Sequence, residues 1–260
     1  MESHPDLDNS GALDAFGQLL SIMEELREKC PWDCKQTMES LRHLTLEEAF
    51  ELSEAILENN TENIKEELGD LLLHIVFYAR IAFEQRSFTI AEVIQALCAK
   101  LIYRHPHIYG QEKAENEQAV KKNWERLKLE EKGNKSVLGG VPRTLPSLIK
   151  AMRIQEKASM VGFDWGSKEE IWKEVQKKMQ EIEHQNVPNS RNLEDVFGEI
   201  LFTLVRYAKL VGINAEDALE KANKKFMQIF QHIEQQIAKQ GKRTTQLSTR
   251  ELMSYWQKAK

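Results

Sequence analysis

The sequence is short of the residues that break helices and of those that form disulfides. Its 260 residues include 12 glycines and 6 prolines, well below the roughly 12% that these two types make up in average proteins. An all-β sandwich needs a turn about every 8–12 residues, so this scarcity argues against that class. The three cysteines, Cys30, Cys34 and Cys98, are few and odd in number. This pattern argues against a disulfide-stabilised secreted fold, and we expect a cytoplasmic chain.

Long apolar runs and an excess of positive charge are also missing. No run of about 18 apolar residues, the length of a membrane-spanning helix, occurs, and the mean hydropathy is −0.53. Residues 1–6 have neither the cationic nor the apolar segment of a secretory signal, so we expect none. The 36 basic and 41 acidic side chains give a formal net charge of −5, which provides no positive field for nucleic acid or anionic lipid. We therefore expect neither a membrane nor a nucleic acid as partner.

Apolar residues recur at helical spacing along almost the whole chain. Thr89 with Glu92, and Ser167 with Glu170, have the spacing of a capping box, which marks the start of a helix. No stretch alternates apolar and polar residues with period two, so we expect no sheet. The spacing predicts an all-α protein with helices over residues 13–29, 41–59 (or 45–59), 62–86, 89–104, 116–132, 147–161, 167–185, 193–212, 215–240 and 249–258.

One stretch interrupts the helical pattern. Residues 133–146 hold three of the twelve glycines and two of the six prolines, which is typical of a domain boundary. We therefore predict an N-terminal domain over 1–132, a linker over 133–146 and a C-terminal domain over 147–260. Gly69–Ala79 and Gly198–Ala208 are identical at five of eleven positions, which favours duplication of one helical bundle.

Two predicted helices of the first domain carry acidic pairs. Glu48 and Glu51 lie three residues apart on one helix face, with Glu47 beside Glu51. Glu67 and Asp70 repeat this spacing on the next helix, directly before the most apolar run of the chain. If the two helices pack antiparallel, the turn between them brings the second acidic pair beside the first. Facing helices of a bundle can build a metal site in this way.

Four carboxylates in a partly buried site repel one another unless a cation neutralises them. Oxygen ligands without histidine or cysteine suit Mg²⁺, or Mn²⁺ in its place, and such an ion keeps positions for phosphate oxygens. A nucleotide or polyphosphate ligand is then implied. However, acidic residues are common on solvated helix faces, and Thr45 with Glu48 also has capping-box spacing. The spacing alone leaves both interpretations open.

Four motifs follow one another in the first half: Cys30-Pro31-Trp32-Asp33-x-x-Gln36-Thr37-x-x-Ser40-Leu41, Glu47-Glu48-x-x-Glu51, Glu67-Leu68-Gly69-Asp70-Leu71-Leu72 and Lys100-Leu101-x-x-Arg104-His105-Pro106-His107. Together with Val161–Trp165 and Ala222–Phe226 in the second half, they resemble the MazG family of nucleoside triphosphate pyrophosphohydrolases. The resemblance implies two tandem helical-bundle domains and a homodimer. It also implies a Mg²⁺-dependent hydrolase that cleaves NTPs or dNTPs to nucleoside monophosphates and pyrophosphate.

The resemblance also implies roles for single residues. The family's metal ligands fall on the carboxylates already singled out: Glu48, Glu51, Glu67 and Asp70. We expect Glu47, or another carboxylate of the cluster, to accept a proton from the attacking water. Lys100 and Arg104, one helical turn apart, are expected to neutralise charge on the phosphates. Trp32 is expected to stack on the base.

Structural alternatives exist for several of these residues. Trp32 could instead plug the end of the helical bundle. Arg104, with His105 and His107, could form a helix C-cap followed by a turn. His74 lies in the apolar run, so we expect a core histidine with satisfied hydrogen bonds rather than a ligand.

The second half departs from the acidic pattern. In the repeat alignment Glu47, Glu48, Glu51, Glu67 and Asp70 correspond to Lys177, Lys178, Glu181, Val196 and Glu199. A lysine in the site repels a divalent cation, and its ammonium could satisfy the remaining carboxylates itself. Ile229 also replaces the arginine of the last motif. We therefore place catalysis in the first domain and a scaffolding or dimer-forming role in the second. The alternative for the whole chain is a non-catalytic nucleotide-sensing or protein-interaction bundle, whereas the net charge disfavours an RNA-binding module.

Overall fold

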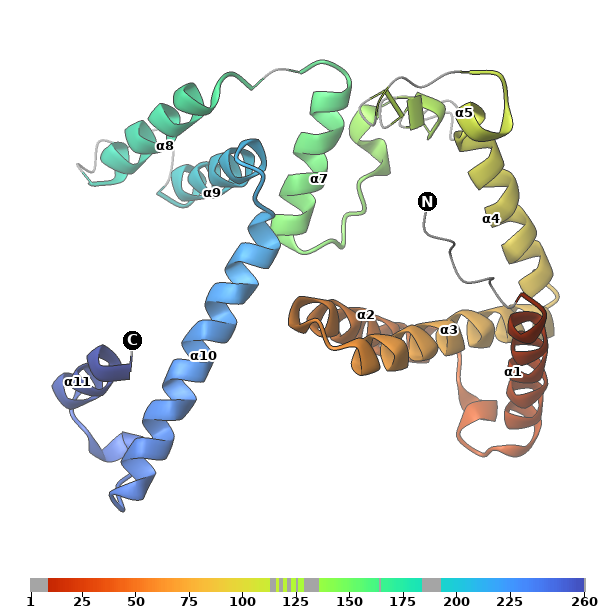
Figure 1. Ribbon diagram of the computed structural model, residues 1–260, viewed down its shortest axis with the longest axis horizontal. Coiled ribbons are helices and arrows are strands. Elements are labelled where there is room, and N and C mark those ends of the chain that lie inside the picture. The colour runs from red at the N-terminus through yellow and green to blue at the C-terminus, as the bar shows by residue number, and fades with distance from the viewer. Residues whose placement is uncertain are drawn as a thin grey trace, which may run out of the picture. The chain divides into compact units, whose positions relative to one another are not determined.

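The computed structural model describes residues 9–112, 116, 119–120, 123–124, 126–128, 136–163, 165–183 and 193–259 (Figure 1). Every regular element in these ranges is a helix, which confirms the prediction of an all-α protein. The chain divides into two compact units, Met1–Ala114 and Glu115–Lys260, and each is described by itself. Within the described ranges, no helix combines the length and the apolar character that crossing a membrane requires.

The first unit is built on α1 (Asn9–Lys29), α2 (Met38–Glu58) and α3 (Thr61–Glu84). Two asparagines join α2 and α3 into an antiparallel pair (Figure 1). Asn59 ends α2 in the left-handed conformation, with φ 54°, which asparagine tolerates better than most residues. The side chain of Asn60 accepts a hydrogen bond from a backbone N–H in the first turn of α3, at 3.2 Å. The expected turn between the two acidic helices is confirmed.

The helix α2 begins earlier than predicted. The Thr37 hydroxyl accepts the backbone N–H of Ser40, and the Ser40 hydroxyl accepts that of Thr37 at 2.9 Å, so this capping box starts the helix at Met38. Thr45 therefore lies in the middle of α2. The interpretation of Thr45 and Glu48 as a capping box is wrong, and Glu48 does not cap a helix.

The core of the first unit lies along the C-terminal half of α3. The side chains that water does not reach come from three helices: Met23 on α1, Leu41 on α2, and Val76, Phe77 and Ile81 on α3. Burial of each such side chain stabilises the fold by about 1.5–3 kcal/mol. Glu67 and Asp70 lie in the other half of α3, beside α2 and outside this apolar core.

The next helix, α4 (Ile90–Arg104), starts with the predicted Thr89–Glu92 capping box and leads into the short α5 (Pro106–Tyr109). It packs against α3 and α5 and extends away from the α2–α3 pair (Figure 1). Its apolar side chains remain largely exposed: Val93, Ile94, Leu97, Leu101 and Ile102.

The second unit contains a corresponding helix pair. Its helices α8 (Lys168–Glu183) and α9 (Leu193–Leu210) pack together around Val175, Val196 and Ile200. The predicted capping box of Ser167 and Glu170 precedes α8 and is confirmed by two reciprocal hydrogen bonds. The other elements of this unit are η2 (Val137–Gly140), α7 (Ser147–Met160), α10 (Ala215–Lys239), η3 (Thr244–Gln246) and α11 (Thr249–Ala259).

The region between the helix pairs is only partly described. The helix predicted over 116–132 lies largely outside the described residues. The described part of the predicted linker, from residue 136 onwards, contains η2, which packs against α7. The division between the two compact units falls between Ala114 and Glu115 in the chain. The domain boundaries at 132 and 147 stay predictions.

Candidate metal centre

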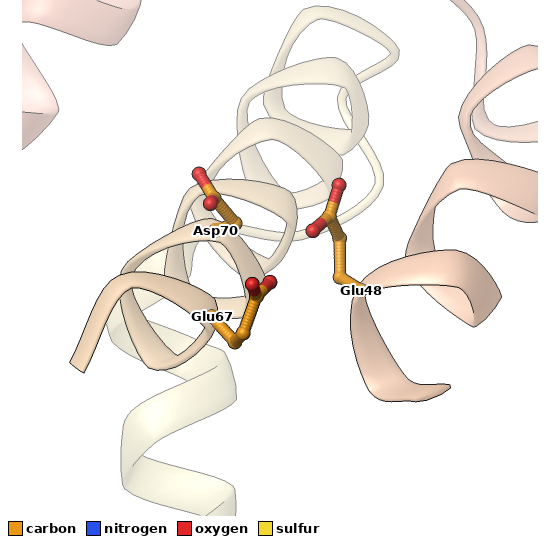
Figure 2. A group of neighbouring side chains, drawn as sticks. All are labelled: Glu48, Glu67 and Asp70. Carbon is orange, nitrogen blue, oxygen red and sulfur yellow. The ribbon is translucent and has the colours of Figure 1, made fainter. Parts of the chain in front are cut away.

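Three carboxylates meet across the α2–α3 pair. Glu48 on α2 faces Glu67 and Asp70 on α3 (Figure 2), and one oxygen atom of each lies within 4.8 Å of the other two. All three residues are half-buried. Opposite oxygen ligands of an octahedral Mg²⁺ are about 4.2 Å apart, given Mg–O distances of about 2.0–2.1 Å. Small side-chain rotations therefore bring these oxygens to coordination distance, and the donor set fits a hard divalent cation.

The charges that act on Glu48 and Glu67 come from neighbouring carboxylates. Partial burial raises the pKa of Glu48, and the charges of Asp70 and Glu51 raise it further, although a hydrogen bond with Glu67 opposes them. Burial likewise raises the pKa of Glu67, together with the charges of Glu51, Glu48 and Asp70. Because the charges acting on these two residues are all negative, a cation is what would stabilise their ionised forms.

The remaining acidic residues of α2 flank the cluster. Glu51 is exposed one turn beyond Glu48 and is not among the three residues whose oxygens converge. Its charge nevertheless acts on both Glu48 and Glu67. Glu47 is also exposed, and its charge acts on Glu48. The structure thus brings three of the four predicted ligands together and places the fourth, with the predicted base, at the edge.

A polar cluster that the sequence analysis did not find lies next to the carboxylates. The Thr45 hydroxyl on α2 lies 2.8 Å from Nδ1 of His74 and 2.6 Å from the hydroxyl of Tyr78, both on α3. His74 is buried, and its burial lowers the pKa of the imidazole despite the nearby charge of Asp70. The prediction of a core histidine with satisfied hydrogen bonds is confirmed. We call Thr45, His74 and Tyr78 the inter-helix polar cluster.

The predicted cationic residues lie on a helix that runs away from the α2–α3 pair (Figure 1). Lys100 and Arg104 lie in the last turn and a half of α4, which extends away from the α2–α3 pair (Figure 1). The Arg104 side chain is buried, with 7% exposed. His105 provides the C-cap of α4, and its Nδ1 lies 2.6 Å from the Leu101 carbonyl oxygen. The helix C-cap that we considered for Arg104, His105 and His107 is therefore present, and His105 forms it.

The loop that carries Trp32 is held firmly while its indole remains open to solvent. The Arg27 guanidinium donates to the carbonyl oxygens of Asp33 and Gln36 and forms an ion pair with Glu84 on α3. Trp32 itself is 54% exposed, which does not fit a side chain that plugs the end of the bundle. An exposed indole on a fixed loop can stack on a planar ligand.

At the corresponding place of the second unit, a lysine takes the position of a metal ligand. The Lys178 ammonium donates to the Glu199 carboxylate and lies 3.4 Å from that of Glu174, and its side chain is 15% exposed. Burial lowers its pKa, but the bonds to Glu199 and Glu174 outweigh this and raise the pKa overall. Val196, the counterpart of Glu67, is fully buried. The expectation that Lys178 satisfies a remaining carboxylate is confirmed.

Comparison with known proteins supports the motif analysis. A family model described as the MazG nucleotide pyrophosphohydrolase domain matches residues 36–109, the region that contains α2, α3 and α4. A Thermotoga maritima protein named "Nucleoside triphosphate pyrophosphohydrolase/pyrophosphatase MazG" is 44% identical over 249 residues, covering 94% of this chain and 95% of that protein. The chain belongs to the MazG family.

Other MazG proteins resemble the chain over its length or over part of it. The Escherichia coli K12 protein named "Nucleoside triphosphate pyrophosphohydrolase" is 36% identical over 258 residues, covering 95% of this chain and 98% of that one. The crystal structure of a mazG-related protein from Thermotoga maritima matches 43% of this chain and 97% of its own, at 30% identity and a TM-score of 0.39. The residues that match the MazG family model, 36–109, include Glu48, Glu67 and Asp70, whose carboxylates converge.

Proposed function

We propose that this chain is a Mg²⁺-dependent nucleoside triphosphate pyrophosphohydrolase that converts an NTP or dNTP and water to a nucleoside monophosphate and pyrophosphate. The observation that carries the proposal is the convergence of Glu48, Glu67 and Asp70 across the α2–α3 pair. The names of the Thermotoga and Escherichia relatives support the same reaction class. All three cysteines are free thiols, which supports the expected cytoplasmic location.

In this proposal Glu48, Glu67 and Asp70, with Glu51 beside them, would hold Mg²⁺, for which Mn²⁺ could substitute. A bound Mg²⁺ supplies charge for the phosphate oxygens and lowers the pKa of a water molecule. Glu47, or another carboxylate of the cluster, would accept a proton from the attacking water. The water attacks the α-phosphorus in line with the leaving pyrophosphate, and the exposed Trp32 stacks on the base.

We infer that the active form is a homodimer. The apolar side chains of α4 are exposed, as are Leu68, Leu72 and Ile75 on α3, and a monomer seldom leaves so many adjacent apolar side chains in water. Lys100 and Arg104 lie at the far end of α4 from the carboxylates of their own unit, so a second copy could bring them to the phosphates. A mixture of Glu67→Gln and Arg104→Ala chains that regains activity lost by each alone would support this arrangement. If size-exclusion chromatography with light scattering shows a monomer, the arrangement is wrong.

We assign no turnover to the second unit. Lys178 already provides a positive charge beside Glu199, so the site has no need of a divalent cation and a metal would be repelled. A scaffolding or dimer-forming role fits this unit best.

The test of the proposed function is product analysis with the full chain. Incubation with each common NTP and dNTP and Mg²⁺, followed by anion-exchange chromatography, should give equal amounts of monophosphate and pyrophosphate, and none in the presence of a chelator. Nucleotide binding without turnover would instead support a sensing role. In ¹⁸O-water, label should appear in the monophosphate; label in pyrophosphate alone would refute attack at the α-phosphorus.

A further inference from the structure

The inter-helix polar cluster lies directly next to the proposed metal ligands. Thr45 precedes Glu48 by three residues on α2, and His74 follows Asp70 by four residues on α3, so each lies one helical turn from a ligand on the same helix face. The contacts of Thr45 with His74 at 2.8 Å and with Tyr78 at 2.6 Å therefore join the two helices at the level next to the carboxylates.

The Thr45 hydroxyl can form hydrogen bonds with the polar groups that surround it. Besides its two contacts across the helix pair, it lies 3.2 Å from the Leu41 carbonyl oxygen. The hydroxyl can accept from Tyr78 and donate its one proton to the Leu41 carbonyl or to His74. In either arrangement the contacts between α2 and α3 are kept. Replacing the hydroxyl by a methyl group leaves polar atoms of the buried His74 and the half-buried Tyr78 without this partner, which destabilises the pairing of α2 and α3.

The second unit shows that such a cluster is not needed to pair the helices. Val175 takes the place of Thr45 and is buried in an apolar core. Thr203 takes the place of His74, and its hydroxyl donates to the Glu199 carbonyl of its own helix at 2.7 Å. At these two positions the first unit therefore has hydrogen bonds across its helix pair, whereas the second unit has an apolar contact and a bond within one helix. The Lys178–Glu199 bond joins the helices of the second unit instead.

The geometry points to Thr45 and His74 as positioning residues of the metal centre: their hydrogen bond fixes the spacing of α2 and α3 against the repulsion of the carboxylates. Glu48 then stays opposite Glu67 and Asp70 before a cation arrives, so less reorganisation is needed on binding. This inference rests on the proposed function, in that the cation is the metal of the proposed reaction. Neither residue is assigned a contact with the substrate or with the metal.

The test uses the residues that the second unit itself carries at these positions. Thr45→Val and His74→Thr should each raise the Mg²⁺ concentration for half-maximal pyrophosphate release about 10-fold, the lower end of the effect of removing a group that orients a metal ligand. The kcat at saturating Mg²⁺ should change much less. Thr45→Ser, which keeps the hydroxyl, should stay near the unsubstituted protein. Thr203→Val makes the matched change in the second unit and should leave the Mg²⁺ dependence unchanged.

A purely structural role predicts a different result. In that case Thr45→Val lowers the melting temperature by the same amount with and without Mg²⁺. The folded protein then needs the same Mg²⁺ concentration for half-maximal pyrophosphate release as the unsubstituted chain. This result would overturn the inference. Circular dichroism checks folding, and His74→Gln replaces Thr45→Val if the latter does not fold. Mn²⁺ binding followed by electron paramagnetic resonance reads affinity without turnover. The inference is thus tested even if the unsubstituted chain releases no pyrophosphate.

Discussion

The two helix pairs of this chain differ in the source of positive charge for their carboxylates. In the α2–α3 pair, Glu48 faces two acidic residues and the charges acting on it are negative. In the α8–α9 pair, Lys178 occupies the corresponding position and bonds to Glu199. The same helix pairing is therefore compatible with a cation from solution or with one from the chain. Only a cation from solution keeps ligand positions for phosphate oxygens, which is why we place the reaction in the first pair.

The largest expected effect is the loss of turnover when a ligand of the first pair is removed. Glu67→Gln should lower pyrophosphate release by more than about 100-fold, because a ligand matters more than the outer groups, whose loss costs roughly 10–100-fold. Glu181→Gln, a carboxylate of the second pair, is the control and should leave the rate unchanged. Equal losses in both variants would break the proposed division of roles. Circular dichroism should show unchanged helicity.

Mg²⁺ should stabilise one pair and not the other. At a concentration of 100 times its Kd, a ligand that binds only the folded state adds about 2.7 kcal/mol, so hydrogen exchange of amides in α2 and α3 should slow by up to about 100-fold. Exchange in α8 and α9 should not change. Equal protection of both pairs would show that the second pair also binds the metal.

Substitution of Lys178, which supplies the positive charge of the second pair, should have a smaller effect. Lys178→Met leaves Glu199 without the ammonium and should cost about 1–3 kcal/mol of stability. Lys178→Glu adds a carboxylate instead and should cost more in a chelator, but Mg²⁺ should now recover part of the loss. Thermal melts of both variants with and without Mg²⁺ give the comparison. If Mg²⁺ stabilises neither variant beyond the unsubstituted chain, the two sites are not equivalent.

The smallest expected effect is a pH dependence that only the metal-free first pair shows. The pKa values of Glu48 and Glu67 are raised in the folded chain above the ordinary value of 4.5. Their contribution to stability is therefore present below that value and is lost as the pH rises through the raised pKa. In a chelator, the amides of α2 and α3 should be less protected from hydrogen exchange at pH 8 than at pH 5, after correction for intrinsic exchange rates.

The second pair provides the internal control for this pH dependence. The pKa of Lys178 is raised, so its contribution is complete below the ordinary lysine value and is lost only as the pH rises above it. The same interval should leave α8 and α9 unchanged. Saturating Mg²⁺ should remove the trend in the first pair, since the metal favours the ionised carboxylates.

The sequence predicted the helices and most of the carboxylate cluster because both depend on local spacing. Residues three apart share a helix face, and a short connection makes neighbouring helices antiparallel, so Glu48, Glu67 and Asp70 could be expected to meet. The start of α2 was placed too late because its capping box uses Ser40 instead of the usual glutamate or glutamine. The apolar run around His74 was sufficient to predict that this residue is buried.

The rest depends on contacts that spacing does not encode. An apolar run indicates that His74 is buried, but not that Thr45 lies opposite it on another helix. Likewise, the motif of Lys100 and Arg104 indicates positive charge, but not that α4 extends away from the α2–α3 pair (Figure 1). The Lys178–Glu199 bond was easier to foresee, because a lysine in place of a glutamate reverses the charge at one position.

The Lys178–Glu199 bond has a consequence for the molecule under magnesium shortage. A chelator or dilution cannot remove an ammonium that belongs to the chain, whereas an ion held by Glu48, Glu67 and Asp70, as we propose, would exchange with the solvent. Depletion of the ion should therefore stop turnover in the first unit while the second unit keeps its fold. The protein would then remain folded but inactive until the ion is restored.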